Sequence, residues 1–159
     1  MSAVATHNDL AIATLRARES TDDVGVCWCD QSFGKMMLAQ GSGCIVNISS
    51  IAGSVSLYPQ SQVSYNASKA GVDLLTKSLA GEWARRGVRL NAAAPTYIET
   101  AMMKRGVSEG WGQAWPDRKS MQRMSQASEI GAVVHFPASD AASLLTGAVV
   151  MADAGYTSW

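Results

Sequence analysis

Three side chains, Ser50, Tyr65 and Lys69, are of the types that together can act on one carbonyl or carbinol oxygen. Tyr65 and Lys69 are four residues apart, so on a helix they lie on one face, one turn apart. A free tyrosine titrates at about pH 10, which is too high for a base at neutral pH. A neighbouring lysine cation is expected to favour the phenolate. Ser50 could then hold the substrate oxygen while Tyr65 gives or takes the proton. A hydride carrier is also needed, because no side chain supplies a hydride.

The elements that must position these residues follow from the hydrophobic pattern, which alternates between helical spacing and short apolar runs. Strands joined by helices require right-handed crossovers, which predicts an α/β fold with a parallel sheet of about three strands. The residues from 96 to 125 are irregular and rich in Met, Gly and Trp, which is typical of a substrate loop with short helices. The expected strands are 44–49, 88–93 and 147–152, and the expected helices are 8–18, 22–39, 63–86 and 128–138.

The ends of the expected strands also point to one site. Ser50 follows the first strand, residues 95–100 follow the second, and residues 153–156 follow the third. In a parallel sheet, ligands bind in the crevice outside the carboxyl ends of the strands. The three segments are therefore expected at one edge of the sheet.

Four segments resemble the short-chain dehydrogenase/reductase family, and the likeness runs from about residue 25 to the end of the chain. The YNASK segment at 65–69 matches the family's YxxxK motif, and GCIVNISS at 43–50 is similar to the strand that leads to its catalytic serine. Residues 89–100 resemble the RxN…PGxxxT segment, and residues 145–156 resemble the closing TG…DGG segment. Four such segments in the family's order are far more specific than a lone YxxxK.

The resemblance implies only part of the family's fold. Its members begin with a TGxxxGxG turn and later carry an NNAG segment, and neither is in this sequence. The implied fold is a partial Rossmann-like, doubly wound parallel sheet with flanking helices, without the N-terminal mononucleotide-binding half. Residues 22–159 are then the C-terminal catalytic half, and residues 1–21 are an N-terminal segment with no assigned structure.

By the same resemblance, the catalytic residues are Ser50, Tyr65 and Lys69, and the cofactor is NAD or NADP. Asp22 stands where many members carry a catalytic asparagine, and no metal site is expected. Each residue also has a structural alternative: Ser50 could cap a turn, Tyr65 could be an ordinary helix residue, and Lys69 could be a solvated charge. The residues expected to bind the cofactor are Tyr65, Lys69, Pro95, Ile98 and Thr100.

Three functions remain open on this basis. The first is an oxidoreductase that interconverts a secondary alcohol and a ketone, and the segments 58–62 and 155–159 look like those of members acting on polyols and ketoses. The second is a truncated, inactive remnant that serves at most as an oligomerisation or binding partner. The third is an independent binding module, for which the sequence offers no dedicated feature.

The composition limits which kinds of partner are expected. Thirteen basic and thirteen acidic residues cancel, so neither nucleic acid nor an anionic membrane is an expected partner. No apolar run approaches the length that spans a bilayer, and the N-terminus lacks the layout of a secretion signal, so a cytoplasmic location is expected. The expected partners are a small alcohol or ketone and, by resemblance, further copies of the chain bound through the helices near 22–39 and 63–86.

Overall fold

A three-stranded parallel sheet forms the centre of the molecule. The computed structural model describes residues 21–60 and 62–159, so the helix expected at 8–18 lies outside the described residues. Strands β1 (Gly43–Ile48), β2 (Val88–Pro95) and β3 (Val149–Ala152) lie in the order β1-β2-β3. All three are parallel, which confirms the α/β fold with a sheet of three strands.

Strand β2 is the most buried of the three, because it has a neighbour on each side and helices over both faces. All of its residues except Arg89 are buried, as expected for a central parallel strand. The sequence predicted an end before Pro95, and this was wrong. Pro95 pairs in register with Ala152, and the amide of the next residue, Thr96, donates to the Ala152 carbonyl at 3.2 Å. A proline lacks an N–H, but at the last position of a strand its neighbour supplies the bond.

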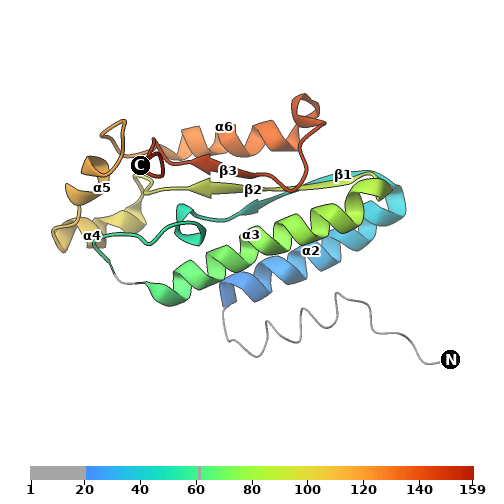
Figure 1. Cartoon of the computed structure of the whole chain (residues 1–159), viewed down its shortest axis with the longest axis horizontal. Helices are drawn as coiled ribbons and strands as arrows, with labels where there is room; N and C mark the ends of the chain where they lie inside the picture. The colour runs from blue at the N-terminus through green and yellow to red at the C-terminus, as the bar shows by residue number, and fades with distance from the viewer. Residues whose placement is uncertain (1–20, 61) are drawn as a thin grey trace.

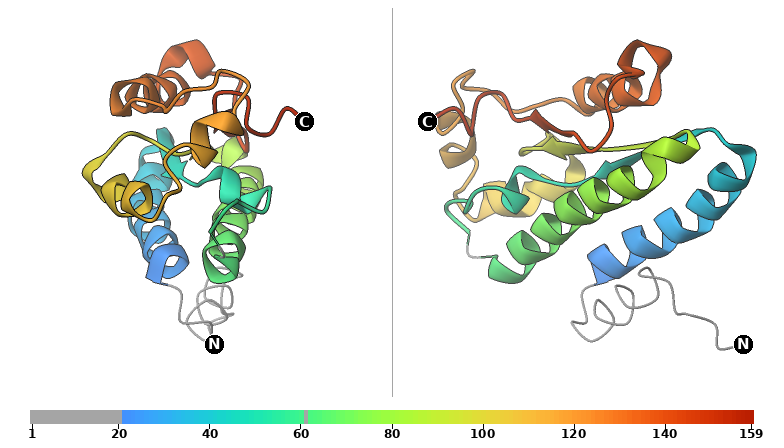
Figure 2. Two further views of the ribbon diagram at one scale, coloured as in Figure 1. Left: turned by 90° about the vertical axis from the view of Figure 1, so that its left-hand side faces the viewer. Right: turned by 45° about the vertical axis from the view of Figure 1, so that its right-hand side comes forward.

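In the part of the chain that the structure describes, two helices cover one face of the sheet and one helix covers the other (Figure 1; Figure 2). Helices α2 (Thr21–Gln40) and α3 (Val63–Trp83) lie side by side on the first face, and α6 (Ala127–Ala138) lies on the second. Buried side chains of α3 pack on β2 to form the larger core; these are Leu79, Ala80 and Trp83 with Val88 and Leu90. Among the residues the structure describes, no helix is long and apolar enough to cross a membrane.

The ends of α3 and α6 show how local sequence sets the helix boundaries. The last predicted turn of α3 is instead a 3-10 turn, η2 (Ala84–Arg86), and Gly87 follows with φ of 81°. Glycine is suited to this position because it adopts the left-handed conformation without a steric penalty. Helix α6 begins with a capping box, in which the backbone N–H of Gln126 donates to the Glu129 carboxylate at 2.8 Å.

The residues after β2 form short helices at the carboxyl ends of the strands. They are η3 (Ala101–Met103), α4 (Lys104–Ser108) and α5 (Ala114–Asp117), and Figure 1 shows α4 and α5 beyond the arrowheads of the sheet. A second buried cluster of Ile51, Tyr97, Trp115 and Tyr156 anchors this part of the chain. Ile51, Tyr97 and Tyr156 come from the three segments that were expected at this edge, so the buried cluster connects these segments.

Candidate functional site

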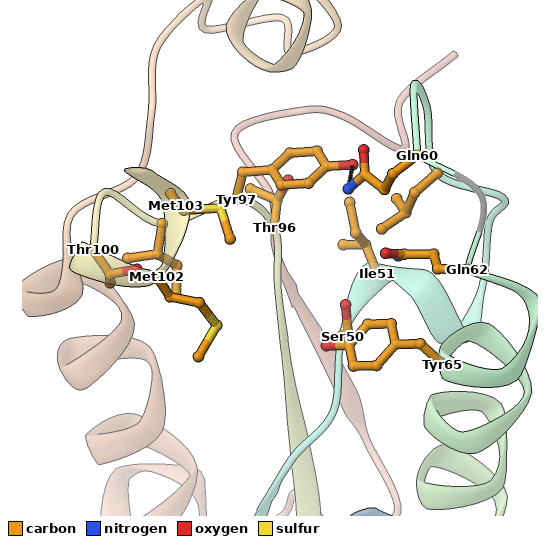
Figure 3. A pocket seen from close by; sticks show the side chains of 12 residues that line it. Ser50, Ile51, Gln60, Gln62, Tyr65, Thr96, Tyr97, Thr100, Met102 and Met103 are labelled. Atoms are coloured by element: carbon orange, nitrogen blue, oxygen red, sulfur yellow. Dashed lines mark hydrogen bonds between the residues drawn. The ribbon is translucent and has the colours of Figure 1, made fainter. Parts of the chain in front are cut away.

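A cavity of about 480 Å³ opens at this edge, beside the ends of β1 and β2. Ser50 and Tyr65 lie together at one end of it, and Gln60 and Tyr97 lie at the other, with Ile51 between them (Figure 3). The size is within the usual range for a small-molecule site. The lining residues are Ser50, Ile51, Leu57, Gln60, Gln62, Tyr65, Thr96, Tyr97, Ile98, Thr100, Met102 and Met103.

Ser50 has two roles in the local structure. It directly follows β1, and its Oγ accepts a hydrogen bond from the Ala52 amide at 3.1 Å, which caps the 3-10 turn η1 (Ile51–Gly53). The cap fixes the side chain so that it also faces the cavity. A serine hydroxyl has a second lone pair and a proton for another partner. The structural and the chemical interpretations of Ser50 are therefore compatible.

Tyr65 and Lys69 lie one turn apart near the start of α3. Tyr65 is half-buried and lines the cavity, whereas Lys69 is not among the lining residues. The Lys69 Nζ lies 5.6 Å from the centroid of the Tyr65 ring and donates to the Ile48 carbonyl at 3.3 Å. An ammonium has three donors, and one of them is used in that bond. The helix thus presents a phenol to the cavity with a cation behind it.

A close contact through Gly53 holds Ser50 beside α3. A β-carbon on Gly53 would lie 2.8 Å from the Lys69 carbonyl carbon and 2.8 Å from the Asp73 Oδ2, closer than such atoms approach. The Ser49 hydroxyl reinforces the contact by donating to the Lys69 carbonyl at 3.3 Å. Because Gly53 lacks a side chain, η1 can sit directly on the helix that carries the phenol.

The residues expected to bind the cofactor are only partly brought together. Ile98 and Thr100 line the cavity; Ile98 is half-buried and forms a β-bridge with Ser125, and Thr100 is exposed. Pro95 is buried at the end of β2 and does not line the cavity. The side chain of Asp22 lies outside the described residues. Of the expected cofactor contacts whose side chains are described, Tyr65, Ile98 and Thr100 therefore share the cavity, whereas Pro95 and Lys69 do not line it.

Sequence reasoning missed the polar groups at the far end of the cavity. Gln60 bonds to both Tyr97 and Trp115, two residues that the sequence placed only in an irregular loop. Tyr97 stacks on Trp115 with ring centroids 4.7 Å apart. Burial, and to a smaller extent the nearby Tyr156, raises the pKa of the Tyr97 phenol well above its usual range, so this phenol stays protonated. The periodicity of the sequence offered no signal for these contacts.

A buried lysine lies behind the same wall. Lys119 is 1% exposed, and its Nζ donates to the Tyr97 carbonyl at 3.0 Å. Burial lowers the pKa of Lys119 to about 8, with nearby Arg123 adding to the effect. The bond ties the residues after β2 to the chain segment before α6.

Known proteins resemble this chain over most of its length. The family model described as "Enoyl-(Acyl carrier protein) reductase" matches residues 13–157. A galactitol 2-dehydrogenase of Rhizobium johnstonii is 47% identical over 136 residues, which is 85% of this chain and 53% of the relative. A galactitol 2-dehydrogenase (L-tagatose-forming) of Cereibacter sphaeroides is 42% identical and is matched over 96% of this chain and 65% of its own length.

A solved structure agrees with the fold. The crystal structure of a gluconate 5-dehydrogenase from Burkholderia cenocepacia, in complex with NADP and tartrate, superposes with a TM-score of 0.81 at 29% identity. The match covers 99% of this chain and 59% of that protein. The chain thus spans between about half and two thirds of the length of the relatives it matches.

Proposed function

Since the chain belongs to the short-chain dehydrogenase/reductase family, we propose that it supplies the catalytic half of an NAD(P)-dependent oxidoreductase. The reaction is the interconversion of a secondary alcohol and a ketone, and the substrate is a polyol or a sugar. The observation that carries the proposal is the cavity at the carboxyl edge of the sheet, into which both Ser50 and Tyr65 project. The substrate class rests on relatives whose names are polyol dehydrogenases.

The three polar residues divide the proton chemistry among them. The Ser50 hydroxyl donates to the substrate oxygen and holds it beside Tyr65. During oxidation the Tyr65 oxygen takes the hydroxyl proton of the alcohol, and during reduction it returns that proton to the carbonyl oxygen. The Lys69 ammonium lies behind the ring, with its Nζ 5.6 Å from the centroid of Tyr65. A bound nicotinamide would supply the hydride chemistry at the carbinol carbon, so that oxidation of the alcohol would remove one hydride and one proton in total.

The residues of this chain fit the nicotinamide end of such a cofactor. Ile98 and Thr100 line the same cavity as Ser50 and Tyr65, and Pro95 at the end of β2 leads into their segment. Tyr65 and Lys69 offer a phenol and ammonium donors toward the ribose hydroxyls. Tyr65, Lys69, Ile98 and Thr100 are the cofactor contacts we assign to the chain, with either NAD or NADP as the ligand, and Pro95 positions the segment that carries the last two.

The alternative is an inactive partner of other subunits, and two features favour it. Helices α2 and α3 carry exposed large apolar side chains, among them Phe33, Met36 and Leu74. Strand β1 pairs only with β2 within the described residues, which leaves one edge open. Under either function we propose self-association through α2 and α3, because such apolar surface is costly in water. A cytoplasmic location stays a prediction.

The experiment that tests the function compares cofactor binding and turnover in the whole chain. Tryptophan fluorescence is titrated with NADH and NADPH, and turnover of galactitol, D-arabinitol and D-threitol is followed by nicotinamide absorbance. We expect saturable binding, measurable turnover, and a loss of about 10²–10⁴ in kcat for Tyr65→Phe with binding retained.

The matched control is Tyr58→Phe, which removes an exposed hydroxyl outside the cavity lining and should keep the activity. Equal activity of Tyr65→Phe and the unchanged protein would refute the proton role of Tyr65. A folded chain that neither binds cofactor nor turns over any polyol would favour the inactive partner.

A further inference from the structure

The end of the cavity away from Ser50 and Tyr65 carries one amide in a largely apolar wall. Gln60 lies there, half-buried, and apolar side chains elsewhere in the cavity, among them Ile51, Leu57, Met102 and Met103, line much of the remaining surface. A glutamine in a loop is usually solvated and free to rotate. Here the surrounding groups hold it in one orientation.

Three hydrogen bonds fix this orientation. The Trp115 indole N–H donates to the Gln60 Oε1 at 3.3 Å, and the Gln60 Nε2 donates to the Tyr97 hydroxyl at 2.9 Å. The Tyr97 hydroxyl in turn donates to the Tyr58 carbonyl at 3.4 Å. Because Tyr97 and Trp115 are buried and stacked on each other, both anchors of the amide are rigid. The chain of bonds also decides which end of the amide donates and which accepts.

The Gln60 amide has a hydrogen-bond donor and an acceptor that these contacts leave unused. A primary amide has two N–H donors and two acceptor lone pairs, and the bonds to Tyr97 and Trp115 use one of each. In addition, the buried Thr96 hydroxyl lines the same cavity and has no hydrogen-bond partner among the described residues. A wall with one spare donor, one spare acceptor and an unpaired hydroxyl is matched by a hydroxyl group, which both donates and accepts.

We infer that Gln60 is a specificity-determining residue that binds a substrate hydroxyl several carbons away from the reacting oxygen. The inference rests on the proposed function and narrows its substrate to a chain with hydroxyls beyond the reacting carbon. The Ser50 and Tyr65 hydroxyls bind the oxygen on the carbon that is oxidised, and the Gln60 amide binds a distal hydroxyl of the same molecule. A simple secondary alcohol leaves the amide without its partner and gains nothing from this end of the cavity.

A kinetic comparison tests the inference with two six-carbon alcohols. Galactitol carries hydroxyls along its whole chain, and 2-hexanol carries only the reacting one. Gln60→Leu should lower kcat/KM for galactitol by about tenfold to a hundredfold, mainly through KM, and change the value for 2-hexanol by less than about twofold. Gln60→Glu keeps the shape and the acceptor for Trp115 but removes both N–H donors, so it should shift the preference in the same direction. The control Gln62→Leu removes an amide of the same size from the same cavity and should shift it less.

A binding measurement tests the role of Gln60 even if the chain shows no turnover. Of the five tryptophans, Trp115 donates its indole N–H to Gln60, so its indole NMR resonance reports on the amide. With excess nicotinamide cofactor present, galactitol should move the Trp115 resonance in the unchanged protein and in Tyr65→Phe, but not in Gln60→Leu. The Trp115→Phe variant assigns the resonance.

The outcomes separate the inference from the proposed function. If turnover fails but galactitol moves the Trp115 resonance only when Gln60 is present, the inference stands and the proposed activity fails. If turnover occurs and Gln60→Leu keeps the preference for galactitol over 2-hexanol, the activity stands and the inference is overturned. The inference is also overturned if galactitol, D-arabinitol and D-threitol all leave the Trp115 resonance unmoved.

Discussion

The buried carboxyl group of Asp30 should make the stability of this protein depend on pH in a specific way. Asp30 lies on α2, is 1% exposed, and accepts a hydrogen bond from the Asn47 amide at 3.0 Å. Asn47 also donates to the Thr76 hydroxyl at 3.0 Å, so the cluster joins α2, β1 and α3. Burial raises the pKa of Asp30 from 3.8 to about 6, and the bond from Asn47 opposes this rise. At pH 7 the folded protein therefore holds a charge that it disfavours.

The magnitude follows from this pKa. One pH unit corresponds to about 1.4 kcal/mol, so the interval from 3.8 to about 6 corresponds to about 3 kcal/mol at neutral pH. Asp30→Asn removes the charge and keeps an acceptor for Asn47, but its new N–H donors lack a partner, which costs about 1 kcal/mol. The variant should be more stable than the unchanged protein at pH 7 by about 2 kcal/mol.

The sign of the pH dependence follows from proton binding. Between pH 4 and pH 6 the folded state binds more protons at Asp30 than the unfolded chain does, so this residue's contribution to stability falls as pH rises through that window. The advantage of Asp30→Asn should therefore appear at pH 7 and vanish or reverse at pH 4.

Urea unfolding at both pH values, followed by tryptophan fluorescence, measures this difference. Asp140→Asn, which changes an exposed carboxylate, is the control and should show no such shift. A stability difference for Asp30→Asn that is the same at both pH values would refute the reasoning.

Two further substitutions test other contacts around the site. Lys119→Met should raise the unfolding free energy at pH 7 by about 1–2 kcal/mol, since it removes a buried cation at the cost of the bond to the Tyr97 carbonyl and a weaker one to the Met124 Sδ. This gain should shrink between pH 8 and 10.5, where the folded lysine is already neutral and the unfolded one is not; a gain unchanged up to pH 10.5 would contradict the assignment. Gly53→Ala should lower the unfolding free energy by about 1–3 kcal/mol, because its β-carbon meets the backbone of α3 at Lys69. Urea unfolding measures the stability of both variants. The control for added bulk is Gly25→Ala, whose β-carbon would meet nothing within 4 Å. Equal effects of the two alanine variants would refute the close contact at Gly53.

The sequence by itself determined the order of the elements and the end of the sheet that carries the cavity. Strand β1 and helix α3 were predictable because apolar residues recur at the spacing of each element, and Gly87 marks a helix end by its backbone freedom. The helical spacing of Tyr65 and Lys69 placed them on one face, and the structure has the ammonium beside the ring. These features depend on residues close to one another in the chain, so a local pattern contains them.

Only the tertiary structure decided how the cavity is lined. Gln60 meets Trp115 across 55 positions of sequence, and Lys119 reaches the Tyr97 carbonyl across 22. It also showed that β2 extends to Pro95, because residues 92–95 pair with β3, beyond the end that the sequence pattern predicted. Such contacts form between segments that the folded core brings together, and neither spacing nor residue type along the chain records which segments will meet.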